Sequence, residues 1–318
     1  MSAPPPLRLS SQQLAVSLLA DKGADIVSFT DLRRGIDVLF QSPWGRRDLT
    51  HLPPTSDSQL DWLARYCGGW QQLIPNAGEP RSVDGVLRGY HGEAAVVGWD
   101  VTSVDEGSAT FSVRLTTAPL FLTRSVRVDG ATLHVRDTIR NESPAPVEVM
   151  WVQHPAFGAP FIDEQCQLTS GACTIITDAD APGNLLSPDS VFPLDSAVDV
   201  EGAPLDLGAL PGRDSRRSVF AALSDFETAW FAIDSPTAGF GVRVEWDAQL
   251  FPHAWFWQEC NASGGFPWFS RAYVVAVEPA NVLPGRPSSA RPDRGIAPTL
   301  APGATWTSNI SMSRTELP

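Results

Sequence analysis

The sequence predicts an all-β protein, built as a large antiparallel β-sandwich. Apolar and polar residues alternate with a period of two along several short segments, which is the pattern of strands with one buried face. Glycine (25) and proline (28) are scattered through all 318 residues, so turns recur at short, near-regular intervals. Helical patterns are few, and we expect fewer than about a fifth of the residues in helices, below the usual third.

The best helical segment is 58–66, where Leu60, Leu63 and Ala64 share one face and Gly68-Gly69 ends the pattern. Strand alternation is clearest over 111–116, 133–139 and 242–246.

Asp129-Gly130 lies between two such runs and predicts a two-residue hairpin turn. The stretch 178–218 is rich in Pro, Gly, Asp and Ser, which predicts long loops with short strands. We find no repeat and no boundary, and therefore expect one domain over residues 1–318.

The formal net charge of −13 disfavours nucleic acid and anionic membranes as partners, because both carry negative charge. Residues 1–6 lack a basic region followed by an apolar core, and no stretch reaches about 18 apolar residues. The expectation is a cytoplasmic protein.

Neither the cysteines nor the histidines are spaced as metal ligands or as a disulfide framework. The cysteines are Cys67, Cys166, Cys173 and Cys260. The histidines that could bind a metal are His51, His91, His154 and His253. We expect buried thiols, and neither a metal nor an organic cofactor.

Three clusters of polar and aromatic residues lie far apart in the sequence: 68–99, 151–158 and 251–279. Taken singly, each has an ordinary structural explanation. His91 precedes a glycine, as turn histidines do, and His154 precedes a proline at the end of an apolar run. Glu278 follows the apolar run 273–277 and either caps a solvated strand end or projects into a cleft. Tryptophans are buried by default.

Taken in order, these motifs resemble the aldose 1-epimerases of the galactose mutarotase superfamily. The similarity covers about residues 23–284. Its motifs are Gly68-Gly69, Pro75-Asn76-Ala77-Gly78, His91-Gly92, Arg140-Asn141-Glu142, Trp151-Val152-Gln153-His154-Pro155-Ala156-Phe157 and Glu278-Pro279. The resemblance implies the large β-sandwich (supersandwich) of that superfamily and a small-molecule sugar as the binding partner.

The resemblance also implies roles for individual residues. Glu278 would be the catalytic base and His154 the acid, and His91 would hold the ring oxygen or an adjacent hydroxyl. Asn76, Arg81 and Gln258 are expected to contact sugar hydroxyls, and Trp257 to stack on the sugar. The family's substrate-binding carboxylate would correspond to Asp206, Asp225 or neither.

The segment after His91-Gly92 departs from the family pattern. This chain has Glu93-Ala94, where hexose-phosphate mutarotases resemble HGF-A-R. The missing arginine, together with the net charge, favours a neutral sugar, unless Arg65, Arg81 and Arg88 form an anion pocket.

Two other functions compete with mutarotation. One is a different sugar-modifying enzyme on the same fold, namely an epimerase, isomerase or lyase. The other is a non-catalytic carbohydrate-binding protein, since a fold does not determine a function.

Overall fold

The computed structural model describes residues 4–48, 52, 55–178, 183–289 and 291–317. Of these described residues, 48% lie in strands and 5% in helices. All strand pairs in the described part of the chain are antiparallel. The prediction of an all-β antiparallel sandwich with little helix is therefore confirmed.

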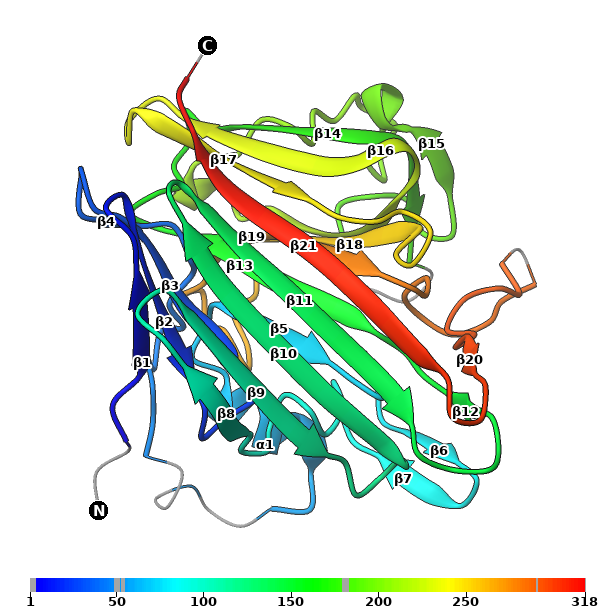
Figure 1. Ribbon diagram of the computed structural model, residues 1–318. Coiled ribbons are helices and arrows are strands. Elements are labelled where there is room, and N and C mark those ends of the chain that lie inside the picture. The colour runs from blue at the N-terminus through cyan, green and yellow to red at the C-terminus, as the bar shows by residue number, and fades with distance from the viewer. Residues whose placement is uncertain (1–3, 49–51, 53–54, 179–182, 290, 318) are drawn as a thin grey trace.

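One layer of the sandwich lies in the foreground of Figure 1. Its strands pair in the order β8 (Asp100–Val104), β9 (Ser108–Arg114), β10 (Leu120–Asp129), β11 (Thr132–Asn141), β21 (Thr305–Thr315) and β17 (Phe240–Glu245). The segments predicted from alternation at 111–116, 133–139 and 242–246 fall on β9, β11 and β17.

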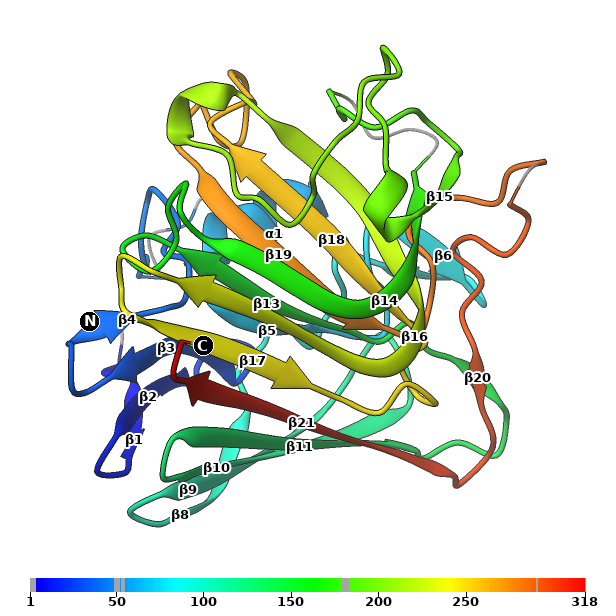
Figure 2. The same ribbon diagram turned by 90° about the horizontal axis from the view of Figure 1, so that it is seen from above.

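The second layer carries the candidate site, and Figure 2 shows it above the first. Its strands pair in the order β1 (Leu7–Ser10), β2 (Leu14–Leu19), β3 (Asp25–Asp31), β5 (Trp70–Leu73), β13 (Val152–Gly158), β19 (Tyr273–Ala280) and β18 (His253–Cys260). The short strand β4 (Ile36–Asp37) pairs with the end of β3.

One long strand connects the layers at one side. The first half of β16 (Ser218–Ser235) pairs with β18 and its second half with β17. Beside β16 runs β14 (Gln167–Thr177), and β15 (Val191–Pro193) pairs with the end of β14. Two small two-stranded sheets are separate from the large sheet: the hairpin of β6 (Arg81–Val83) and β7 (Val86–Arg88), and the pair of β12 (Val147–Glu148) and β20 (Thr299–Leu300).

The hairpin predicted at Asp129-Gly130 connects β10 and β11, but its turn lies one residue later. Asp129 still pairs with Thr132, so the loop residues are Gly130 and Ala131. The stretch 178–218 contains β15 and two single-turn 3-10 helices, η2 (Leu194–Ser196) and η3 (Arg213–Ser215), among the residues described there. This agrees with long loops and short strands.

The predicted helix is α1 (Ser58–Arg65), capped at its start by Asp57. Of the predicted apolar face, Leu63 is buried and Leu60 is exposed, whereas Trp62, which the pattern did not include, is buried. Indole and Leu side chains on this face cover the outer side of the second layer, so the helix packs on the sheet and not between the layers.

Three of the four cysteines are buried as expected, but Cys173 is exposed, and all four are free thiols. No helix in the described part of the chain is long and apolar enough to cross a membrane.

Candidate active site

His154 and Glu278 are cross-strand neighbours on the second layer. Val152 pairs with Ala280 and Ala156 with Ala276, so the register places His154 on β13 directly opposite Glu278 on β19. The His154 Nε2 atom lies 3.5 Å from the Glu278 Oε1 atom. Since side chains alternate between the faces of a strand, both project from the outer face, away from the core between the layers.

Both side chains are almost inaccessible to solvent, with 5% of His154 and 2% of Glu278 exposed. Burial raises the pKa of Glu278 well above its usual value of 4.5. Burial also lowers the pKa of His154 to about 4. Removing a charged group from water disfavours its charged form, so burial favours a carboxylic acid beside a neutral imidazole.

His91 reaches the same place from the turn that follows β7. Its φ of 56° is left-handed, and the next residue, Gly92, has a φ of 77°. The backbone N–H of Gly78 donates to His91 Nδ1 over 2.9 Å. The proton of the neutral imidazole is therefore on Nε2. Burial, with a smaller effect of His154, keeps the pKa of His91 well below 6.5.

Aromatic rings surround the two histidines. Trp62 on α1 lies edge-to-face against His91, with ring centroids 4.6 Å apart, and Tyr66 lies edge-to-face against His154 at 5.8 Å. Trp257 on β18 approaches His154 from the other side at 6.1 Å. These rings provide apolar faces of the kind that pack on the C–H groups of a sugar.

Together these side chains line a pocket of about 620 Å³ on the outer face of the second layer. His91, His154, Glu278, Trp257 and Arg81 all contribute to its wall. Its size falls in the usual range of about 300–1,000 Å³ for small-molecule sites. Segments that are distant in sequence, from α1 to β19, therefore converge at one concave site.

Arg81 is at this pocket but is already engaged. Its guanidinium forms an ion pair with Glu148 and donates to the Gly295 carbonyl oxygen. The other two arginines of the possible anion pocket are also occupied. Arg65 pairs with Asp61, and Arg88 donates to the carbonyl oxygens of Pro75 and Glu148.

Two of the expected sugar contacts lie elsewhere. Asn76 is buried beneath the turn, where its amide donates to the carbonyl oxygens of Glu79 and Gly89, and it is not among the pocket residues. Gln258 follows Trp257 on β18 and so points to the opposite face of the sheet, where its amide donates to the Leu207 carbonyl oxygen. Asn76 supports the loop that carries His91, and Gln258 faces away from the site.

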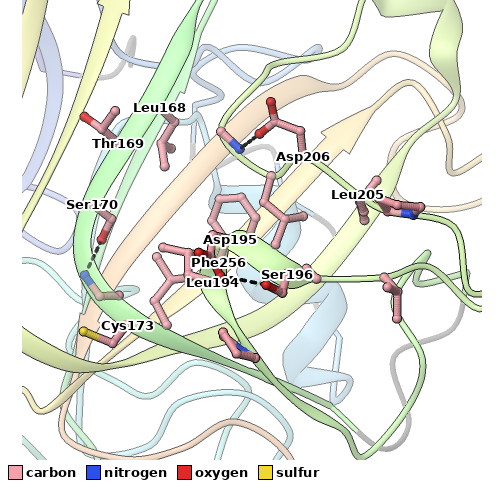
Figure 3. A pocket seen from close by; sticks show the side chains of 18 of the residues that line it. Leu168, Thr169, Ser170, Cys173, Leu194, Asp195, Ser196, Leu205, Asp206 and Phe256 are labelled. Atoms are coloured by element: carbon pink, nitrogen blue, oxygen red, sulfur yellow. Dashed lines mark hydrogen bonds between the residues drawn. The ribbon is translucent and has the colours of Figure 1, made fainter.

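Neither Asp206 nor Asp225 reaches the pocket. Asp206 lies on the other face of the sheet, at a second hollow lined by Leu168, Leu205 and Phe256 (Figure 3). There its carboxylate accepts from the backbone N–H groups of Gly208 and Ala209. Asp225 is exposed on β16 and accepts from the Thr174 hydroxyl.

The structure adds residues that the sequence did not single out. Tyr66, Trp62, Asp178 and Glu259 line the pocket. Glu259 is fully engaged, because its carboxylate accepts from the backbone of Ala262 and Ser263. Trp62 and Tyr66 are four residues apart, which is the spacing of neighbours on one helix face. This signal was available in the sequence, but the predicted apolar face was that of Leu60, Leu63 and Ala64.

No group of three or more His, Cys, Asp or Glu side chains that could hold a metal ion is found within the described ranges. His51 lies outside these ranges. His253, on β18, hydrogen bonds to the Ser224 hydroxyl.

The architecture is that of a galactose mutarotase-like fold. A protein-family model described as "Domain of unknown function (DUF4432)" matches residues 6–192 and 211–313, so the chain belongs to the DUF4432 family. No curated protein matches the chain.

Solved structures share the fold over nearly the whole chain. The Slr1438 protein of Synechocystis sp. PCC 6803 has a TM-score of 0.70 and 14% identity, and the similarity covers 99% of this chain and 96% of that one. A galactose mutarotase related enzyme of Lactobacillus acidophilus has a TM-score of 0.70 and 15% identity, with 98% and 97% covered. A galactose mutarotase-like protein of Lactobacillus casei ATCC 334 has a TM-score of 0.64 and 16% identity, with 97% and 99% covered.

Proposed function

We propose that the chain is an aldose 1-epimerase that interconverts the α and β anomers of a free, neutral aldose. The observation that carries the proposal is the buried, cross-strand pair of Glu278 and His154, 3.5 Å apart, in a pocket lined by aromatic rings. The similarity in fold to a galactose mutarotase related enzyme supports it.

Mutarotation needs one group that accepts the proton of the anomeric hydroxyl and one that donates a proton to the ring oxygen. The bond between C1 and the ring oxygen then breaks, the chain rotates about C1–C2, and closure returns both protons. Two side chains that share a single proton meet this need. The side chain that carries the proton is the acid, and the other is the base. No metal or organic cofactor is required by this chemistry.

The two protonation states of the pair assign opposite roles. With a Glu278 carboxylate and a His154 imidazolium, Glu278 is the base, as the family resemblance implies. With a carboxylic acid and a neutral imidazole, which burial favours, His154 accepts and Glu278 donates. Both states carry one proton on the Glu278–His154 pair. The pair can therefore act in either direction of the reaction.

We infer that His91 holds the sugar and does not exchange protons with it. Its Nδ1 is occupied by the Gly78 N–H, which leaves Nε2–H as a donor in the pocket. Because its pKa is low, it stays neutral and donates one hydrogen bond to a ring or hydroxyl oxygen.

A neutral sugar agrees with the arginines around the site. Arg65, Arg81 and Arg88 each have a partner within the protein, so an anionic group on the substrate would have to displace one of these contacts or pair with Arg286, which also lines the pocket. The proposal is restricted to uncharged aldoses, because none of the three arginines that could form an anion pocket is free to do so.

Replacing Glu278 with glutamine tests the proposal. Glu278→Gln preserves the shape of the side chain but cannot accept or donate the exchanged proton, so anomer exchange should fall at least about 10²-fold. Sugar binding should change only a few-fold, since the loss falls on the transition state. Exchange rates of D-glucose, D-galactose, D-xylose and D-mannose measured by NMR, with and without protein, give the comparison.

A wild-type protein that accelerates none of these sugars, or a Glu278→Gln protein as fast as the wild type, would contradict the proposal. A surface carboxylate replaced in the same way, Glu106→Gln, serves as the control. Glu106 is exposed in the β8–β9 turn and is not among the pocket residues, so its replacement should leave the exchange rate unchanged.

A further inference from the structure

The Tyr66 hydroxyl is a buried polar group without a hydrogen-bond partner. Only 1% of the residue is exposed, and no atom of the described chain accepts from or donates to its hydroxyl. Most buried polar side-chain atoms in proteins are paired, because an unpaired one is costly. Since Tyr66 lines the pocket, a ligand atom can supply the missing partner.

The position of this ring is fixed on several sides. The Tyr66 N–H donates to the Leu63 carbonyl oxygen, and the Tyr66 carbonyl oxygen accepts from the Trp44 indole over 2.7 Å. Its ring stacks on Trp62, with centroids 4.7 Å apart and an angle of 17° between the planes. A side chain held in this way presents its hydroxyl without further ordering when a ligand binds.

The neighbours of Tyr66 are the acid–base pair. Its ring lies 5.8 Å from the His154 ring. Oε2 of Glu278 is also buried and unpaired, so the hydroxyl and the carboxyl group share one pocket without bonding to each other. An oxygen atom placed between them would accept from one and exchange a proton with the other.

The hydroxyl remains protonated at neutral pH. Burial raises the pKa of Tyr66 well above 10, and the nearby Glu278 carboxylate adds to the effect. Tyr66 is thus a hydrogen-bond donor in this site and not a proton carrier.

We propose that Tyr66 is a third catalytic residue of this site, and that its hydroxyl donates a hydrogen bond to the anomeric oxygen of the sugar. The proposal rests on the function proposed above.

In the proposed step, the anomeric proton passes to the basic member of the Glu278–His154 pair, and the electrons of that O–H bond form the C1=O bond. The electrons of the breaking C1–O bond go to the ring oxygen, which takes the proton of the acidic member. Tyr66 keeps its own proton throughout, and its hydrogen bond strengthens as charge develops on the anomeric oxygen.

Tyr66→Phe removes only the hydroxyl. We expect kcat for anomer exchange to fall by about 10²- to 10³-fold, as for the loss of one donor to a developing oxyanion, while KM changes only a few-fold. Because the hydroxyl has no partner in the free protein, the midpoint of thermal unfolding should not decrease.

Tyr273→Phe is the matched control. This tyrosine is also buried, but its hydroxyl donates to the Pro211 carbonyl oxygen over 2.9 Å and does not line the pocket. Its loss should lower the midpoint of unfolding and leave kcat unchanged. The two variants therefore have opposite expected effects on rate and stability.

The outcomes separate this proposal from the proposed function. If Glu278→Gln is slow but Tyr66→Phe is as fast as the wild type on the same aldoses, only the role of Tyr66 is refuted. If Tyr66→Phe destabilises the protein as Tyr273→Phe does, its hydroxyl has a structural partner, and the role is again refuted. If the wild-type protein exchanges none of the sugars, both proposals fall.

Discussion

In the proposed mechanism, Glu278 and His154 exchange protons with the sugar only while they hold one proton between them. Below the pKa of His154 the pair gains a second proton and has no base. Above the raised pKa of Glu278 it loses its only proton and has no acid. The two limbs of the pH profile of kcat/KM would therefore report the apparent pKa values of the pair in the free protein.

The acidic limb gives a test at this scale. Burial places the pKa of His154 at about 4, so kcat/KM should stay level through neutral pH and fall as the pH is lowered through about 4. An exposed histidine would place the fall near 6.5. Anomer exchange measured from pH 3.5 to 8, with circular dichroism at each pH to confirm folding, gives the profile. A midpoint near 6.5 would contradict the burial of His154.

At the scale of elements, strand parity decides which side chains meet. His154 and Glu278 were predicted as a pair from a family resemblance, and the β13–β19 register places them on one face. The same parity excludes Gln258, since it is adjacent to Trp257 in β18 and a strand cannot direct both to one pocket. The alternation was visible in the sequence, whereas the strand register that brings β13 beside β19 arises from contacts 124 residues apart and is not encoded locally.

The turn that carries His91 depends on a crowded glycine. A Cβ at Gly92 would lie 2.4 Å from the Ile74 carbonyl oxygen, whereas a Cβ at Gly85, in the β6–β7 turn, would meet nothing within 4 Å. Both glycines have φ near 78°, at 77° and 78°. Alanine at either position therefore has the same unfavourable φ, and the clash distinguishes them.

Gly92→Ala should lower both stability and the rate of anomer exchange, because the backbone has to shift and displaces His91. Gly85→Ala should cost only the φ strain, about 1–2 kcal/mol, and leave the rate unchanged. Urea unfolding and the NMR exchange assay provide the two measurements. Equal effects of the two substitutions on the rate would show that the position of His91 is not set by this turn.

At the scale of the whole molecule, a buried polar network joins the two layers behind the site. Arg124 on β10 and Asp137 on β11 are 0% and 1% exposed and form a two-bond ion pair, with distances of 2.9 and 3.1 Å. Gln72 on β5 and Gln153 on β13 donate to the same carboxylate over 3.1 and 2.8 Å. Gln153 precedes His154, so the network anchors the strand that carries His154.

Part of this network was visible in the sequence. Arg124 and Asp137 each stand in phase with the apolar residues of their strand, β10 and β11, so the alternation places both on the buried face. The pattern does not name the partners of these charges, because Gln72 and Gln153 come from the second layer, which only the assembled sandwich brings near. The class of fold and the buried face of each strand were therefore predictable from alternation, but the contacts between the two layers were not.

The network predicts a large difference between two aspartates of one hairpin. Asp137→Ala leaves the Arg124 guanidinium buried without its counter-ion, which should lower the free energy of unfolding by about 3–5 kcal/mol. Asp129, in the same hairpin, pairs with Arg127 at the surface, and Asp129→Ala should have no measurable effect because water screens exposed pairs. The double variant Arg124→Leu with Asp137→Leu should recover much of the lost stability, since it removes both charges from the interior. Urea unfolding of the three proteins tests this, and an Asp137→Ala protein as stable as Asp129→Ala would show that the interior tolerates the unpaired arginine.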